Sequence, residues 1–292
     1  MRAVRVHLAF KVARYLVARR QSKHGGPPSE TRDWHAYGEW RHKVLHAQLE
    51  ETFGIHTAVG KDVLDFGCGD GALSTTLIKA GARSVHGVDV DENGLNRFAE
   101  RLKHHAGRAP TFSVSGYSRI DLPDCSFDAI YCFDVLEHVM DYRAIIPEWY
   151  RVLRPGGSVY IWWQPYWHPF GHHAYDWVPI PWAHSFLTDD ELNEVCARIV
   201  DWDGFAAPLW DRNEDGSTKN RFRQPSAGSG FLNKLTVRDF EAVCTASGFH
   251  FARREFTPFS MKQPARVMSS VLSKIRATRD YFTSVALYEL RR

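Results

Sequence analysis

The chain is poor in cysteine and methionine and has no strong excess of either charge. Its 292 residues include 5 cysteines and 4 methionines, and the formal net charge is +3. The cysteines are scattered and form no Cys-x-x-Cys pair. This pattern argues against a disulfide framework or a cysteine zinc site and is typical of reduced thiols in a cytoplasm. The mild charge gives no support to a broad nucleic-acid-binding surface.

The N-terminal stretch 1–20 lacks the continuous apolar segment of a transmembrane helix or a secretory signal. It carries six Arg or Lys residues and no acid, and Val4, Leu8, Val12 and Tyr15 recur at helical spacing. Two interpretations stay open. One is a packed helix with a solvated basic face, and the other is a helix on an anionic membrane surface. We therefore expect a cytoplasmic protein, with peripheral membrane contact as the alternative to packing.

A glycine-rich loop follows the first predicted strand. Gly67, Gly69 and Gly71 separate that strand from a predicted helix, and glycine permits both positive φ and the close approach of a ligand. The next predicted strand ends in Asp89, where a doubly wound sheet binds the two hydroxyls of a ribose. The acidic Asp65, two residues before the first glycine, disfavours a pyrophosphate and favours a ligand with an ammonium group.

Predicted strands and helices alternate along the first half of the chain, which indicates a parallel βαβ sheet. The predicted strands are 61–66, 84–89, 111–114, 127–133 and 158–163, and the predicted helices between them are 72–80, 92–105 and 141–153. A helix near 235–247 and strands near 249–259 and 281–290 follow. We expect four segments: basic and cap helices with a linker (1–54), a core (55–163), a lid or acceptor-binding insertion (164–234), and a C-terminal helix with edge strands (235–292).

Five motifs occur in one order over about 61–163, and together they resemble the class I S-adenosylmethionine (SAM)-dependent methyltransferases, in particular the type 11 small-molecule group. The motifs are Asp65-x-Gly67-x-Gly69-x-Gly71, Asp89, Leu122–Asp128, Asp134-Val135-Leu136-Glu137-His138, and Arg151–Gly157. The resemblance implies an α/β fold: a Rossmann-like, doubly wound, mostly parallel seven-stranded sheet with an antiparallel last strand. It also implies SAM as the cofactor and methyl transfer as the reaction.

The resemblance assigns the cofactor contacts to the loops after the strands. The glycines would pass under the methionine part, Asp65 would attract its ammonium, and Asp89 would accept the ribose hydroxyls. The family's usual acid after the third strand is replaced here by Ser115-Gly116-Tyr117-Ser118. The predicted cofactor residues are Tyr37, Asp65, Gly67, Cys68, Gly69, Gly71, Asp89, Val90, Ser115, Gly116 and Asp134.

Transfer to a hydroxyl needs a base, and histidine is the usual one near neutral pH. His138 follows the fourth strand, where this fold places acceptors, and His172 and His173 lie in the insertion. Histidines near Asp134 and Asp176 also suggest a divalent metal such as Mg²⁺, held by Asp134, His138 and Asp176, which would orient a diol and lower its hydroxyl pKa.

The insertion is rich in aromatic residues and histidines. Its Gly171-His172-His173 and Pro181-Trp182-Ala183-His184 segments are similar to bacterial type 11 methyltransferases linked to cell-surface or storage glycans. Aromatic faces suit sugar rings, although these side chains also suit a small core of the insertion itself. The predicted substrate residues are Trp163, Tyr166, Trp167, His168, Tyr175 and Trp182.

We therefore expect O-methylation of a sugar, glycan or glycolipid hydroxyl. The alternatives are a lipid-like or aromatic acceptor such as a quinone or polyketide, or a SAM-binding protein that has lost transfer. A nucleic-acid acceptor is not expected, because no Asn-Pro-Pro-Tyr-type segment follows the fourth strand. An insertion this aromatic also suits a homodimer.

Overall fold

The computed structural model describes residues 2–24, 34–103, 107–213, 215–223, 232–259 and 265–292. The chain divides into two compact units. Unit 1 consists of 1–39, 165–234 and 259–284, and unit 2 consists of 40–164, 235–258 and 285–292. Four segments were predicted from the sequence, and the structure groups the chain into these two units.

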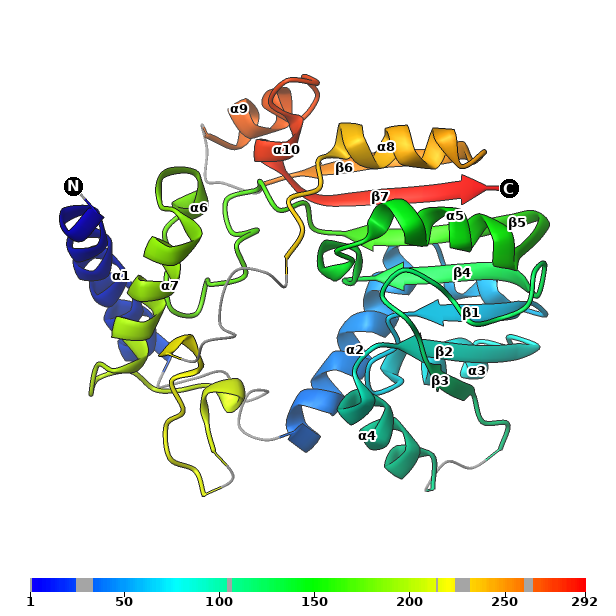
Figure 1. The fold of residues 1–292 in the computed structure, drawn as a ribbon, viewed down its shortest axis with the longest axis horizontal. Helices are drawn as coiled ribbons and strands as arrows, with labels where there is room; N and C mark the ends of the chain where they lie inside the picture. The colour runs from blue at the N-terminus through cyan, green and yellow to red at the C-terminus, as the bar shows by residue number, and fades with distance from the viewer. Residues whose placement is uncertain (1, 25–33, 104–106, 214, 224–231, 260–264) are drawn as a thin grey trace. The chain divides into compact units, whose positions relative to one another are not determined.

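Unit 2 contains a seven-stranded sheet with the order β3-β2-β1-β4-β5-β7-β6 (Figure 1). Its first five strands pair in parallel, and β7 pairs antiparallel with β5. The predicted fold class, an α/β Rossmann-like and mostly parallel sheet, is confirmed. The strands are β1 (Asp62–Phe66), β2 (Ser84–Asp89), β3 (Thr111–Val114), β4 (Phe127–Phe133), β5 (Leu153–Trp163), β6 (His250–Pro258) and β7 (Thr283–Arg291).

Helices cover both faces of the sheet, because successive strand residues point to opposite sides. In β4, Ile130 and Cys132 pack with α5 and α8, whereas Tyr131 and Phe133 pack with α2 and α3. Figure 1 shows α5 and α8 in front of the sheet. The helices associated with the sheet are α2 (Trp34–Thr52), α3 (Ala72–Lys79), α4 (Glu92–Leu102), α5 (Tyr142–Val152) and α8 (Val237–Ala246), with the short 3-10 helices η2 (Ile55–Ala58) and η3 (Leu136–His138).

The fifth strand begins earlier than predicted. The predicted strand starts at 158, but the extended backbone starts at Leu153, where the register with β4 is irregular. Arg154 stabilises this start, because its Nη1 lies 2.9 Å from an Asp62 carboxylate oxygen and 2.7 Å from one of Asp128.

Unit 1 is built on α1 (Arg2–His24) and α7 (Asp189–Val200), which pack along each other. The buried residues of α1, among them Val6, Ala13 and Val17, share a core with Val195 and Ile199 of α7. The other helices of the unit are α6 (Ala183–Phe186), α9 (Ala265–Leu272), α10 (Arg279–Phe282) and the 3-10 helices η4 (Leu209–Asp211) and η5 (Arg221–Arg223). Within the described ranges, no helix is both long enough and apolar enough to cross a bilayer.

Candidate cofactor and acceptor site

A pocket of about 280 Å³ opens in unit 2 where β1, β2 and β4 end and where the loop follows β3. The strand order reverses between β2-β1 and β4-β5, so the pocket lies at the switch point where open α/β sheets bind ligands. It is lined by Phe66, Gly67, Val88, Asp89, Val90, Ser115, Gly116, Tyr117, Asp134, Val135, His138, Val139, Met140 and Ile145.

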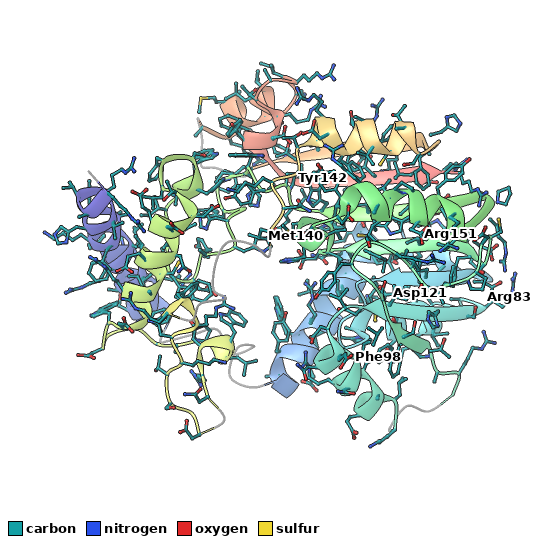
Figure 2. The ribbon with its side chains drawn as sticks, in the orientation of Figure 1. Arg83, Phe98, Asp121, Met140, Tyr142 and Arg151 are labelled. Carbon is teal, nitrogen blue, oxygen red and sulfur yellow. The ribbon has the colours of Figure 1, made fainter. Side chains whose placement is uncertain are left out.

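The loop after β1 needs glycine at two positions. Gly67 and Gly71 both have φ of 76°, which side-chain-bearing residues rarely adopt. A Cβ on Gly67 would lie 2.4 Å from a methyl carbon of Val135, and one on Gly71 would lie 2.1 Å from the ring of Phe98. Phe98, labelled in Figure 2, comes from α4. Glycine therefore lets the loop pack close to both neighbours while Gly67 lines the pocket.

The carboxylate of Asp89 is held by backbone donors on both sides. The N–H of Gly69 donates to one oxygen at 2.7 Å, and the N–H of Asp91 donates to the other at 2.8 Å. An ionised carboxylate has about four acceptor positions, so each oxygen keeps one for a ligand hydroxyl. This geometry fits the pair of ribose hydroxyls that the sequence predicted for Asp89.

Asp65 lies beneath the loop and is not among the residues that line the pocket. Its side chain is 1% exposed, and the Ser74 hydroxyl donates to it at 2.6 Å. Burial, with the nearby Asp89 charge as a smaller cause, raises the pKa of Asp65 to about 7. A cation bound above the loop would favour the ionised form of this carboxyl. The attraction of an ammonium by Asp65 stays a prediction.

A charged group lies where β4 ends. Asp134 has a φ of 61° and lines the pocket, and its carboxylate oxygen lies 2.8 Å from Nη2 of Arg41 in α2. Glu137 is buried beside them, and burial together with the charge of Asp134 raises its pKa well above the ordinary value. The sequence predicted neither the pairing of Arg41 with Asp134 nor the burial of Glu137, because both depend on how α2 packs against the end of β4.

Four other predicted residues line the pocket. Val90, Ser115 and Gly116 line it from the loops after β2 and β3, and His138 lines it from η3, of which it is the last residue. His138 is exposed, so an acceptor in the pocket can reach its ring. Met140, 49% exposed and labelled in Figure 2 just before α5, gives this side an apolar surface.

Several predicted residues lie elsewhere. Cys68 belongs to the loop, but its side chain is buried, and a Cβ on Gly87 would lie 2.7 Å from its sulfur. Gly69 and Gly71 belong to the loop but not to the pocket lining. Tyr37 belongs to unit 1, where its ring packs edge-on against Trp210. Trp163, expected to bind substrate, is fully buried and packs on Phe240, because its position in β5 points it into the core beneath α5 and α8.

Three buried histidines, His168, His172 and His184, form a histidine cluster in unit 1. The rings of His172 and His184 lie 5.3 Å apart, centroid to centroid. Burial is the largest cause that lowers the pKa of His168 to about 3, that of His172 to about 3 and that of His184 to about 4. Such groups stay neutral near pH 7, and a pKa this low makes His172 a weak base. His173, the other predicted base in the insertion, is half-buried with a φ of 50°.

The predicted aromatic substrate residues of the insertion pack mainly on one another and on their neighbours in unit 1. Tyr166 lies 4.8 Å from the His184 ring, and Trp167 lies 5.8 Å from Tyr281, centroid to centroid. The Trp182 indole N–H donates to the Tyr281 carbonyl at 3.1 Å. Tyr175 is 43% exposed, with the Arg20 guanidinium 5.1 Å from its ring centroid. Their substrate role stays a prediction.

The described residues include no group of three or more His, Cys, Asp or Glu side chains placed to hold a metal ion. The predicted ligand Asp134 pairs with Arg41, and Asp176 lies 3.4 Å from Nη1 of Arg20. A guanidinium on each carboxylate competes with a cation, so the structure gives the predicted metal no support.

Residues 64–161 match a family model described as a methyltransferase domain. A protein of Mycolicibacterium smegmatis, named a probable S-adenosylmethionine-dependent methyltransferase, is 36% identical over 119 residues, which are 40% of this chain and 41% of that protein. A ubiquinone biosynthesis O-methyltransferase of Idiomarina loihiensis is 34% identical over 138 residues, 45% of this chain and 55% of that protein. The chain thus spans about half the length of these curated relatives.

Solved structures agree on the fold. Phosphoethanolamine N-methyltransferase 2 of Haemonchus contortus, in complex with SAM, matches with a TM-score of 0.52 at 16% identity. The match covers 86% of this chain and 52% of that chain. A protein of Pyrococcus horikoshii has a TM-score of 0.51 at 15% identity, over 90% and 93% of the two chains. Unit 2 therefore has the Rossmann-like fold of the class I SAM-dependent methyltransferases. The methyltransferase-domain match lies within this unit.

Proposed function

We propose that the chain is a SAM-dependent O-methyltransferase that acts on a hydroxylated aromatic, lipid-like acceptor of the quinol type. The observation that carries the proposal is the pocket at the switch point, where the two oxygens of Asp89 are oriented by Gly69 and Asp91 beside a glycine loop. The methyltransferase-domain match over 64–161 supports the same cofactor.

Two observations support a quinol-type acceptor. Relatives named ubiquinone biosynthesis O-methyltransferases favour the quinone-type acceptor over the sugar that the insertion suggested first. The pocket also presents Val135, Val139, Met140 and Ile145 near His138, and this apolar surface suits an aromatic ring better than a polyol.

The reaction would be an in-line displacement. SAM held at the glycine loop would supply the methyl group: its carbon–sulfur bond would break as the acceptor oxygen bonds to the methyl carbon, and the bonding pair would stay on sulfur. His138 would take the hydroxyl proton as the bond forms. Asp89 would hold the adenosyl group and the apolar side of the pocket would align the ring, so the protein would contribute mainly distance and orientation.

Two measurements test this. Calorimetry with SAM should show binding to the wild type and to Asp121→Asn, whose exposed carboxylate lies outside the pocket lining (Figure 2). Methyl-labelled SAM should then label a catechol or quinol with an alkyl tail, and His138→Gln should lower kcat while SAM binding persists.

The outcomes separate the alternatives. Label only in saccharides would overturn the quinol-type acceptor and restore the glycan. SAM binding without label in any phenol, lipid or saccharide fraction would indicate a protein that has lost transfer. Absence of heat from SAM with folded protein would refute the cofactor itself.

A further inference from the structure

The helix α1 has an apolar stripe on the face that does not pack in unit 1. Val4, Leu8, Val12 and Tyr15 are 70%, 61%, 42% and 63% exposed. Their spacing of four, four and three residues places them on one side of the helix. The opposite side, with Val6, Ala13 and Val17, already fills the core with α7, so core packing does not account for the stripe.

The charges of α1 are all of one sign. The helix contains no acidic residue. Arg5 and Arg20 pair with Glu191 and Asp176 on the packed side. Lys11 lies beside the exposed stripe and Arg19 lies one turn beyond Tyr15, and neither makes an ion pair within the described part of the chain. The outer face is therefore apolar along its middle and cationic at one side and at its C-terminal end.

The same combination recurs at a second place in unit 1. Val267, Met268 and Val271 of α9, with Ile275 just after it, are 58%, 52%, 54% and 47% exposed. Three exposed cations lie among them: Arg266, Lys274 and Arg276. None of the three forms an ion pair with another described residue. Two separate elements of one unit thus expose large apolar side chains bordered by unpaired cations.

We propose that unit 1 docks on an anionic lipid surface through the outer face of α1 and through α9. Apolar side chains at the centre and Arg or Lys at the edges are the features by which interfacial helices insert below anionic headgroups. A second copy of this chain would meet the same cations on its own α1 and α9, which disfavours self-association through these faces. Docking needs no methyl transfer, so it stands or falls separately from the proposed function.

Vesicle co-sedimentation tests the docking. The wild-type protein should bind vesicles of phosphatidylglycerol and phosphatidylcholine at least about tenfold better than vesicles of phosphatidylcholine alone, and added salt should weaken the binding. Leu8→Asp with Val12→Asp, and separately Lys11→Glu with Arg19→Glu, should each lower the binding by about tenfold or more.

The matched controls are exposed residues of unit 2. Val59→Asp and Lys79→Glu remove an apolar and a cationic side chain at positions that are exposed in the same way, and both should bind as the wild type does. Circular dichroism checks the fold of every variant. If Leu8→Asp with Val12→Asp fails to fold, the charge-reversal variant Lys11→Glu with Arg19→Glu tests the proposal by itself, because both of its side chains are exposed.

Three results would overturn the proposal. The first is equal binding to neutral and anionic vesicles, or none to either. The second is a loss of binding in the unit 2 controls as large as in the α1 variants. The third is a wild-type protein that binds no vesicles and forms a dimer in sedimentation velocity, with the dimer lost in Leu8→Asp with Val12→Asp. A second copy of the chain would then be the partner of this face.

Discussion

The two carboxylates near the glycine loop differ in their surroundings, and the difference decides what each can do. Asp89 lines the pocket and keeps acceptor positions open, whereas Asp65 is 1% exposed and bonded to Ser74. Asp89 can therefore contact a ligand directly. Asp65 contacts α3 through Ser74, and its predicted effect on a ligand would act only through its charge.

Replacing Asp89 by Asn should weaken SAM binding about tenfold to a hundredfold, because a hydrogen bond to a charged group contributes about 1.5–3 kcal/mol. One amide oxygen also replaces two carboxylate oxygens, so Gly69 or Asp91 loses its acceptor. Isothermal titration at one salt concentration measures the loss. An affinity equal to that of Asp121→Asn would show that Asp89 does not hold the ribose.

At the scale of elements, the turn between β1 and α3 depends on glycine for two separable reasons. Gly71 has a positive φ, and it also lies against the ring of Phe98. Gly60 has a φ of 70° in the same unit, but no atom lies within 4 Å of the place where its Cβ would be. The two positions therefore share the backbone conformation and differ in the contact.

Gly71→Ala should lower the free energy of unfolding of unit 2 by about 2–4 kcal/mol, because left-handed strain of about 1–2 kcal/mol adds to the displacement of Phe98. Gly60→Ala should lower the free energy of unfolding only by the left-handed strain, about 1–2 kcal/mol. Urea unfolding followed by circular dichroism compares them. Equal losses in the two variants would mean that α4 moves freely and that the contact with Phe98 contributes nothing.

At the scale of the whole molecule, the two units should respond differently to acid. The pKa values of the histidine cluster are lowered to about 3–4 in the fold, against about 6.5 for an exposed histidine. Between these values the unfolded state binds more protons, so the stability of unit 1 falls as the pH drops below about 6.5. Burial raises the pKa of Asp211 to about 6 and also raises the pKa of Asp176, so these two carboxyls oppose the loss, but they are two groups against three histidines.

Hydrogen exchange at pH 7.5 and pH 5.5 should therefore show unit 1 losing protection more steeply than unit 2. His184→Gln removes one titrating group. The slope of the free energy of unfolding of unit 1 against pH should therefore fall by the equivalent of about one proton. His173, Lys234 and Asp189 are the charged or titratable neighbours of the cluster and stay unchanged. His7→Gln, on the exposed side of α1, is the control. If the stability of His184→Gln depends on pH as steeply as that of the wild type, the histidine cluster is not neutral and buried in the fold.

The sequence determined the core of unit 2 closely. The predicted strands 84–89, 111–114 and 127–133 have the same bounds in the structure, because apolar runs bounded by glycine, proline and polar residues specify short buried strands locally. The glycine loop after β1 and the position of Asp89 at the end of β2 were likewise predicted from residue spacing along the chain, and Gly67 and Asp89 line the pocket.

Only the tertiary structure decided which distant residues meet. Arg41 pairs with Asp134, Trp163 turns into the core, and residues 1–39 share a unit with 165–234 and 259–284. No local pattern encodes these relations, because they follow from how helices and strands that are far apart in sequence pack together. Periodicity and spacing thus determined the sheet and the glycine loop of unit 2, whereas the burial of the histidine cluster and the exposed face of α1 followed from packing within unit 1.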